Sequence, residues 1–150
     1  MDLDAEQYRV APGHRIRLAD SPTDVVDNDD KKEIRKETDR LLARLSELQD
    51  RLYAEGKARV LVVLQATDTG GKDGAIKKVF GAVNPQGLRI AGFKAPTATE
   101  LSHDYLWRAH AEVPADGGLT IFNRSHYEDV LIVRVHNLVP RPRWRKRYRH

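Results

Sequence analysis

The chain has 150 residues, a formal net charge of +4 and no cysteine. One domain is the simplest organisation at this length, and the lack of cysteine excludes disulfides, thiolate metal sites and cysteine nucleophiles. The polar start of the chain does not resemble a signal peptide, and no apolar run approaches the roughly 20 residues that span a bilayer. We therefore expect a cytoplasmic protein with no membrane partner.

Residues 1–29 are expected to form an irregular arm, and residues 30–150 one domain that opens with a long helix. Asp30 and Glu33 have the spacing of a capping box at the start of this helix, and Gly56 is placed to end it. Apolar residues recur at helical spacing between them, which predicts packing in the core or at a subunit interface. This stripe consists of Ile34, Leu41, Leu42, Leu45, Leu48 and Leu52.

Strand and helix patterns alternate through the rest of the chain. Strands are expected at residues 60–66, 88–94 and 119–122, and helices at residues 75–83, 97–113 and 127–138. Such alternation predicts an α/β fold with a parallel sheet, whose ligands lie beyond the carboxyl ends of the strands. The residues at those ends are Asp68, Lys72, Phe93, Lys94, Asn123 and Arg124.

The turn after the first strand resembles a phosphate-binding loop. Gly71 and Lys72 match the Walker A pattern G-x-x-x-x-G-K-[ST]. Ala66 replaces the first glycine of that pattern, and Asp73 replaces its Ser or Thr. The backbone N–H groups of such a turn, together with the start of the next helix, converge on one anion. Asp68 would be compatible with bound phosphate if a divalent cation bridges the two. The alternative is an ordinary turn that uses glycine for its positive φ angles.

The end of the third strand carries a second group of polar residues. Asn123 lies where P-loop kinases place the acid that holds Mg²⁺, and Arg124 follows with a planar fork suited to phosphate oxygens. Glu128 and Asp129 could supply the missing negative charge and hold Mg²⁺ together with Asp68. The alternative is that both acids only favour the N-terminus of a helix.

Basic residues are unevenly distributed along the chain. The last ten residues, RPRWRKRYRH, combine six Arg or Lys with two aromatic residues, which is typical either of a polyanion-binding segment or of a solvated tail. Other basic residues near the proposed loop favour an anionic substrate. These are Lys77, Lys78, Arg89 and Lys94.

Taken together, these segments resemble the polyphosphate kinase 2 family. The matching stretches are QATDTGGKDGAI (65–76), VNPQG (83–87), FKAP (93–96), HDYLWR (103–108) and FNRSHYEDV (122–130). The resemblance implies a P-loop kinase-like, three-layer α/β/α fold with a parallel sheet, preceded by a long N-terminal helix. It also implies phosphoryl transfer between inorganic polyphosphate and a nucleoside mono- or diphosphate (AMP, ADP or GDP), with Mg²⁺ or Mn²⁺ as cofactor.

The resemblance also assigns the residues of the site. The expected catalytic residues are Asp68, Lys72 and Arg124, and the expected metal ligands are Asp68 and Asp129. The expected nucleotide contacts are Asn123, Arg124 and Glu128. The expected phosphate contacts are Thr69, Gly70, Gly71, Lys72, Asp73, Gly74, Lys77, Lys78 and Lys94.

Members of this family continue beyond the equivalent of residue 150, with a lid and two further strands. We therefore expect either a fragment of a longer protein or a homo-oligomer, a dimer or a tetramer, that completes the fold by association. In this chain the strand at residues 60–64 is expected to have an unpaired edge, and a bare apolar edge promotes association.

Two other functions remain open from the sequence. An ATP-dependent P-loop nucleotide kinase would use Lys72 and Arg124 in the same way but would need no polymer channel. A non-catalytic polyanion-binding module would work through residues 141–150. A specific nucleic-acid partner is not expected.

Overall fold

A computed structural model of the chain describes residues 6, 9–21 and 31–150, which fall into two compact units, residues 1–36 and 37–150. In the first unit the described residues include a turn at Pro12 and Gly13 and the short 3-10 helix η2 (Leu18–Asp20). The expected domain boundary at residues 29 and 30 and the expected helix cap at Asp30 lie outside the described residues.

Helix α1 (Lys31–Glu55) crosses from the first unit into the second. It ends as expected, because Gly56 has a φ of 59° and its N–H donates to the carbonyl of Leu52 at 3.2 Å. The apolar stripe does not fill the core of this chain, since Ile34, Leu41 and Leu48 are exposed. Packing of this stripe at a subunit interface stays a prediction.

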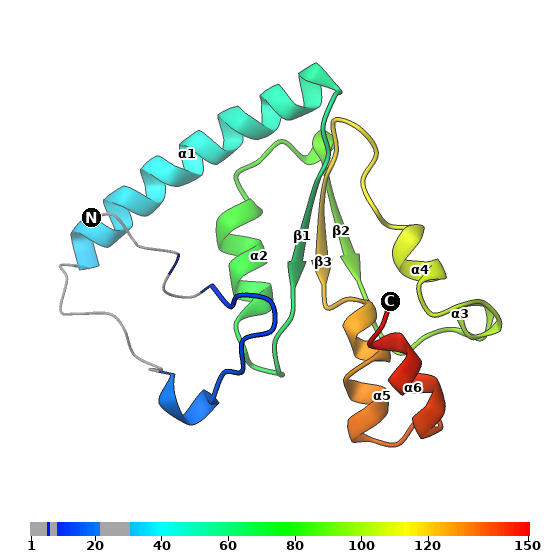
Figure 1. The fold of residues 1–150 in the computed structure, drawn as a ribbon. Helices are drawn as coiled ribbons and strands as arrows, with labels where there is room; N and C mark the ends of the chain where they lie inside the picture. Colours follow the sequence, from blue (N-terminus) through cyan, green and yellow to red (C-terminus); the bar gives the residue numbers. More distant parts are fainter. Residues whose placement is uncertain (1–5, 7–8, 22–30) are drawn as a thin grey trace. The chain divides into compact units, whose positions relative to one another are not determined.

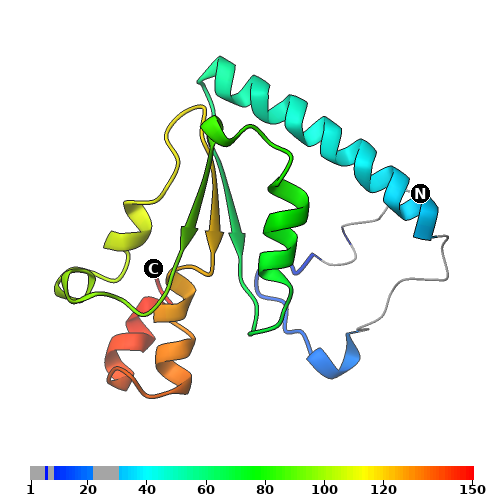
Figure 2. The ribbon, with the colours of Figure 1, turned by 180° about the vertical axis from the view of Figure 1, so that it is seen from behind.

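Three parallel strands form the sheet, in the order β1-β3-β2 (Figures 1 and 2). They are β1 (Val60–Leu64), β2 (Leu88–Gly92) and β3 (Leu119–Asn123). The α/β class and the parallel sheet are therefore confirmed. Strands β1 and β2 are each two residues shorter than expected, and β3 is one residue longer. Among the described residues β1 pairs only with β3, so its other edge is unpaired as predicted.

Helix α2 (Lys72–Phe80) lies on one side of the sheet, and the segments from α3 to α6 lie on the other (Figures 1 and 2). The expected bounds of α2 were wrong at both ends. The helix begins at Lys72 rather than at residue 75, because Gly71 turns the chain directly into its first turn. A 3-10 helix, η3 (Pro85–Gly87), then leads into β2.

The single helix expected at residues 97–113 is wrong, because the chain forms α3 (Ala98–Ser102) and α4 (Trp107–His110) instead. The capping box of Thr97 and Glu100 is present as expected. The break follows from His103, which is extended, and from Asp104, whose carboxylate accepts a hydrogen bond from the N–H of Leu106 at 2.9 Å.

The helix expected at residues 127–138 is likewise divided, into the 3-10 helix η4 (His126–Asp129) and α5 (Ile132–Val135). The Ser125 hydroxyl caps η4 by accepting from the N–H of Tyr127. The basic end of the chain is not a free tail, because residues 141–147 form α6 (Arg141–Arg147). Arg134 of α5 packs against this helix, with its guanidinium 5.2 Å from the centre of the Trp144 ring.

The core lies where β2 and β3 end. Phe93 and Phe122 pack there with ring centres 4.7 Å apart, and Ala91 and Ala109 complete this cluster. Ile121 in the middle of β3 is fully buried. This packing holds the carboxyl ends of the two strands, and the residues that follow them, in fixed positions. Within the described residues, no helix combines the length and the apolar character needed to cross a membrane.

Candidate functional site

The loop between β1 and α2 has an unusual backbone conformation. Thr69 and Gly71 have φ angles of 65° and 80°, in the left-handed region. A Cβ atom on Gly70 would lie 2.6 Å from the Cβ of Ala66, so the loop closes tightly on itself there. Gly71 is the N-cap of α2 and has no side chain to occupy the helix terminus. The first N–H groups of a helix lack intrahelical partners, so this loop is suited to an anion.

Lys72 folds back over the loop in the structure. Its Nζ atom donates hydrogen bonds to the carbonyl oxygens of Ala66 at 2.9 Å and Thr67 at 3.0 Å. The ammonium is therefore held beside the loop by neutral acceptors. A phosphate oxygen would be a stronger, charged acceptor at the same place.

Two pairs of side chains connect this loop to the end of β3. Arg124 binds the carboxylate of Asp68 at 2.5 Å, and Asn123 donates to the carboxylate of Asp73 at 2.7 Å. Arg124 also lies 3.6 Å from the carboxylate of Glu128. It too has a positive φ, of 66°, and its N–H donates to the carbonyl of Leu64. A residue that is not glycine adopts this conformation at an energetic cost, and such strain often marks a functional site.

Sequence reasoning missed Gln65 as part of this network. Its side-chain amide donates to Glu128 at 2.6 Å and accepts from the hydroxyl of Ser125 at 3.2 Å. Ser125 is fully buried, so the connection is anchored in the core. The position of Gln65 directly after the apolar strand was the available signal, because that is where a parallel sheet places ligand contacts.

A cavity of about 450 Å³ lies between the loop and the ends of β2 and β3. Seven of the predicted site residues line it, namely Asp68, Thr69, Lys72, Asp73, Lys94, Asn123 and Arg124. Three of these are cations and two are carboxylates, so the cavity is polar with a net positive charge. The structure thus brings together residues from all three strand ends, as the parallel topology predicts.

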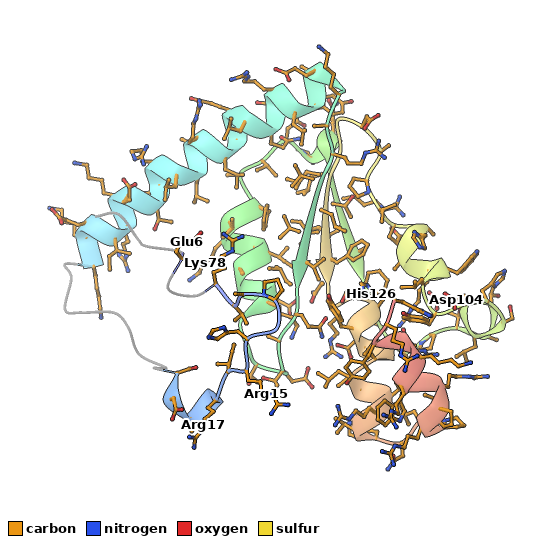
Figure 3. All side chains as sticks on the ribbon, viewed as in Figure 1. Glu6, Arg15, Arg17, Lys78, Asp104 and His126 are labelled. Atoms are coloured by element: carbon orange, nitrogen blue, oxygen red, sulfur yellow. The ribbon has the colours of Figure 1, made fainter. Side chains whose placement is uncertain are left out.

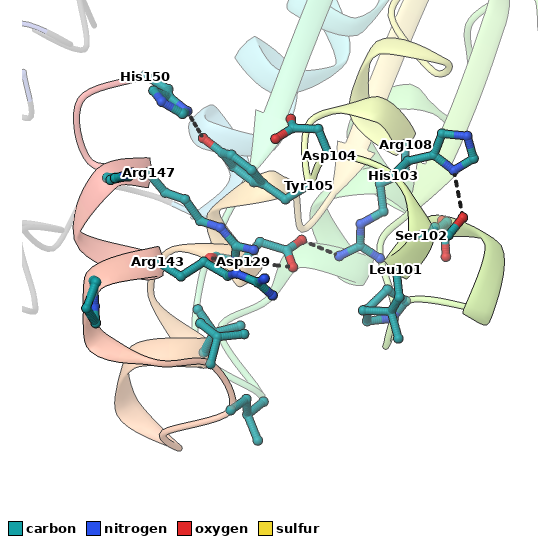
Figure 4. A pocket seen from close by; sticks show the side chains of 17 residues that line it. Leu101, Ser102, His103, Asp104, Tyr105, Arg108, Asp129, Arg143, Arg147 and His150 are labelled. Carbon is teal, nitrogen blue, oxygen red and sulfur yellow. Dashed lines mark hydrogen bonds and ion pairs between the residues drawn. The ribbon is translucent and has the colours of Figure 1, made fainter.

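Other predicted residues lie outside this cavity. Gly74, Lys77 and Lys78 belong to α2, and the last two are exposed side chains in its final turns. Asp129 lines a different cavity, of about 820 Å³, which lies between the α3–α4 segment and α6 (Figure 4). The structure does not join Asp129 to Asp68 at one cavity.

The carboxylate of Asp129 is bound by arginines. Arg108 donates to it at 2.7 Å, and Arg147 approaches it at 3.9 Å (Figure 4). The described residues contain no group of three or more His, Asp or Glu that could hold a metal ion. The assignment of Asp129 as a metal ligand stays a prediction. Sequence reasoning also missed the pairing of Arg108 with Asp129, because contacts between distant segments cannot be read from one sequence.

Two titratable groups near Asp129 have shifted pKa values. Burial lowers the pKa of His126, and the nearby Asp129 opposes that shift. Burial raises the pKa of Tyr105, and the neighbouring Asp104 adds to that effect. In the chain His126 follows the end of β3, and Asp104 lies between α3 and α4 (Figure 3).

The family described as Polyphosphate kinase 2 (PPK2) matches residues 27–150. The chain belongs to the polyphosphate kinase 2 family. The family is thus the one that the motifs of the sequence predicted, and the match covers the loop, the cavity and α6.

Two similar proteins are polyphosphate phosphotransferases by name. The AMP/ADP-polyphosphate phosphotransferase of Meiothermus ruber is 55% identical over 147 residues, which are 97% of this chain and 55% of that protein. The ADP-polyphosphate phosphotransferase of Rhodopseudomonas palustris is 43% identical over an alignment of 162 positions, which covers 99% of this chain and 56% of that protein. The chain thus spans about half the length of these two relatives.

A crystal structure of Polyphosphate Kinase 2 from Arthrobacter aurescens TC1 has a similar fold. The TM-score is 0.82 at 42% sequence identity, over 96% of this chain and 52% of that one. A putative polyphosphate kinase 2 from Pseudomonas aeruginosa gives a TM-score of 0.72 at 32% identity, over 79% and 25% of the two chains. The described fold is therefore that of one part of a polyphosphate kinase 2 protein.

Proposed function

We propose that the intact protein transfers a phosphoryl group between inorganic polyphosphate and a nucleoside mono- or diphosphate, such as AMP, ADP or GDP. The observation that carries this proposal is the cavity where Lys72, Lys94 and Arg124 gather beside the strained loop and the N-terminus of α2. The names of the two relatives described above, both polyphosphate phosphotransferases, support the same substrate class.

The residues of the loop would bind and orient the phosphate chain, as in a P-loop. The N–H groups at the start of α2 would donate hydrogen bonds to phosphate oxygens, and Lys72 would exchange its two carbonyl partners for phosphate. Arg124 would present its planar fork to the transferred group. Phosphoryl transfer needs little covalent help from the protein, so positioning and neutralisation of charge account for most of the catalysis.

A divalent cation fits the residues of this cavity. Asp68 and Asp73 both line it and offer hard carboxylate oxygens. Mg²⁺ is commonly held by one or two carboxylates together with substrate phosphates, so a complete cage of protein ligands is not required. We propose that Asp68 holds Mg²⁺ or Mn²⁺, with Asp73 of the same cavity as a second ligand. When bound, the cation would neutralise charge on the phosphate oxygens.

The direct test supplies the full-length natural protein with AMP or ADP, polyphosphate and Mg²⁺, without ATP. Nucleotide phosphorylation measured by chromatography is the expected result. Formation of product only when ATP replaces polyphosphate would instead identify an ATP-dependent nucleotide kinase. Absence of product with either donor would contradict the proposal.

A further inference from the structure

Arg108 is a buried arginine that joins the two strand ends beside the phosphate cavity. Only 7% of its surface is exposed. Its Nη2 atom donates to the carboxylate of Asp129 at 2.7 Å, and its Nη1 atom donates to the backbone carbonyl of Lys94 at 2.8 Å (Figure 4). Asp129 lies in the segment that follows β3 and Lys94 in the segment that follows β2, so one guanidinium connects these two segments.

The same guanidinium also lies over an aromatic ring that borders the phosphate cavity. Its central carbon is 5.5 Å from the centre of the Phe93 ring, within the range of a cation–π contact. Phe93 and Lys94 both line the cavity, whereas Arg108 does not. Arg108 is therefore placed to determine where Lys94 lies without touching a ligand in that cavity.

Asp129 is itself held from the opposite side. Arg147 of α6 donates to its backbone carbonyl at 2.5 Å and lies 3.9 Å from its carboxylate. The guanidinium of Arg147 lies 4.5 Å from the centre of the Tyr105 ring, which limits its movement. Asp129, which fixes Arg108, is thus itself held by Arg147. Removal of either Arg108 or Asp129 from this buried pair would leave an uncompensated charge.

We propose that Arg108 is a positioning residue that places Lys94 at the phosphate cavity. The inference rests on the proposed function, because the role of Lys94 as a phosphate contact belongs to it. The planar fork of arginine serves two acceptors in fixed directions, and the single ammonium of lysine does not reproduce that geometry. Arg108→Lys should therefore keep the positive charge at this position but no longer hold Lys94 in place.

A double-mutant cycle in the full-length protein tests this role. Arg108→Lys and Lys94→Met should each raise KM for polyphosphate about tenfold, and the double variant should be no worse than Lys94→Met alone. Additive losses, or an unchanged KM in Arg108→Lys, would overturn the proposal. Arg59→Met is the matched control, because Arg59 forms an exposed ion pair with Asp116 outside the residues that line the cavity.

Asp129→Asn is the second variant for this test, and binding of tripolyphosphate is the second measurement. If Arg108→Lys does not fold, Asp129→Asn enters the same cycle, because it weakens the hydrogen bond that fixes Arg108. The cycle is also run on the dissociation constant of tripolyphosphate, measured by calorimetry. If the wild-type protein binds tripolyphosphate but shows no turnover, the proposed function is contradicted, and the binding cycle still tests the role of Arg108. If the losses of binding are additive, the role of Arg108 is contradicted and the proposed function is not. If the wild-type protein does not bind tripolyphosphate, both the proposed function and the role of Arg108 are overturned.

Discussion

The ammonium of Lys72 can donate hydrogen bonds either to loop carbonyls or to a bound phosphate. In the structure it donates to two loop carbonyls, and a bound phosphate would offer a charged acceptor in the same region. Hydrogen bonds to charged acceptors are roughly twice as strong as those between neutral groups. The present contacts therefore keep the side chain next to the loop without competing strongly with an anionic substrate.

Replacement of this lysine tests its part in phosphoryl transfer. Lys72→Met in the full-length protein should lower turnover by about 10²–10³-fold, because one donor to the transition state is lost. The urea unfolding midpoint should change little, since Lys72 contributes no buried contact to the core. Lys57→Met, an exposed lysine after α1, is the control. Undiminished turnover in Lys72→Met would remove the proposed role.

The lowered pKa of His126 makes the free energy of unfolding fall at acidic pH. Burial lowers its pKa below the ordinary value of 6.5, so the unfolded chain binds more protons between that value and the lowered one. Stability should therefore be fully present above pH 6.5 and decline as the pH falls through this window. Urea unfolding of the wild type and of His126→Gln, about one pH unit on either side of 6.5, measures the effect. An equal loss in both proteins would show that other groups cause it.

At the scale of elements, Gly71 and Gly74 distinguish two reasons for a glycine: a positive φ angle and a lack of room for a side chain. A Cβ atom would meet nothing within 4 Å at either Gly71 or Gly74, but only Gly71 has a positive φ, of 80°. Gly71→Ala should cost about 1–2 kcal/mol of unfolding free energy through left-handed strain. Gly74→Ala, inside α2, should gain about 0.4–1 kcal/mol. Urea unfolding of both variants measures the difference, and equal changes would contradict this account.

The sheet could be predicted from sequence, whereas the helices that follow β2 and β3 could not. Short apolar runs between turn residues define β1 and β3 well, because buried parallel strands carry such runs. The break at His103 and Asp104 depends on a side-chain hydrogen bond to Leu106 that competes with helix formation. A periodic apolar pattern does not reveal this competition.

The candidate site was predictable as far as it follows from topology. Parallel strands bring their carboxyl ends to one edge, so Asp68, Lys94 and Arg124 were expected together, and they line one cavity. The surroundings of Asp129 were not predictable in this way. Its partner Arg108 is 21 residues away, and both positions depend on how the broken helices pack.

At the scale of the whole molecule, β1 presents an apolar edge that pairs with no other strand of the described residues. Val60 and Leu61 are 41% and 40% exposed, although they belong to a sheet strand. Unpaired edge strands accept strands from other chains. This edge is therefore open to strand addition.

This edge predicts concentration-dependent association of the chain of residues 1–150. Leu61→Lys should shift the distribution toward monomer, because a charge on an edge strand disfavours strand addition. Val135→Lys removes an exposed apolar side chain of α5 instead, and it should leave association unchanged. Sedimentation velocity at several concentrations measures both. Association that is equal in Leu61→Lys and in the wild type would place the contact elsewhere.

The central claim is that the loop between β1 and α2 binds phosphate. A crystal structure of the protein with pyrophosphate and Mg²⁺ tests it most directly. We expect phosphate oxygens at the N–H groups of Thr69, Gly71 and Lys72, with the Nζ atom of Lys72 moved from the carbonyls of Ala66 and Thr67 to the ligand. A loop without ligand, in which Lys72 keeps both carbonyl partners while pyrophosphate binds elsewhere, would contradict the claim.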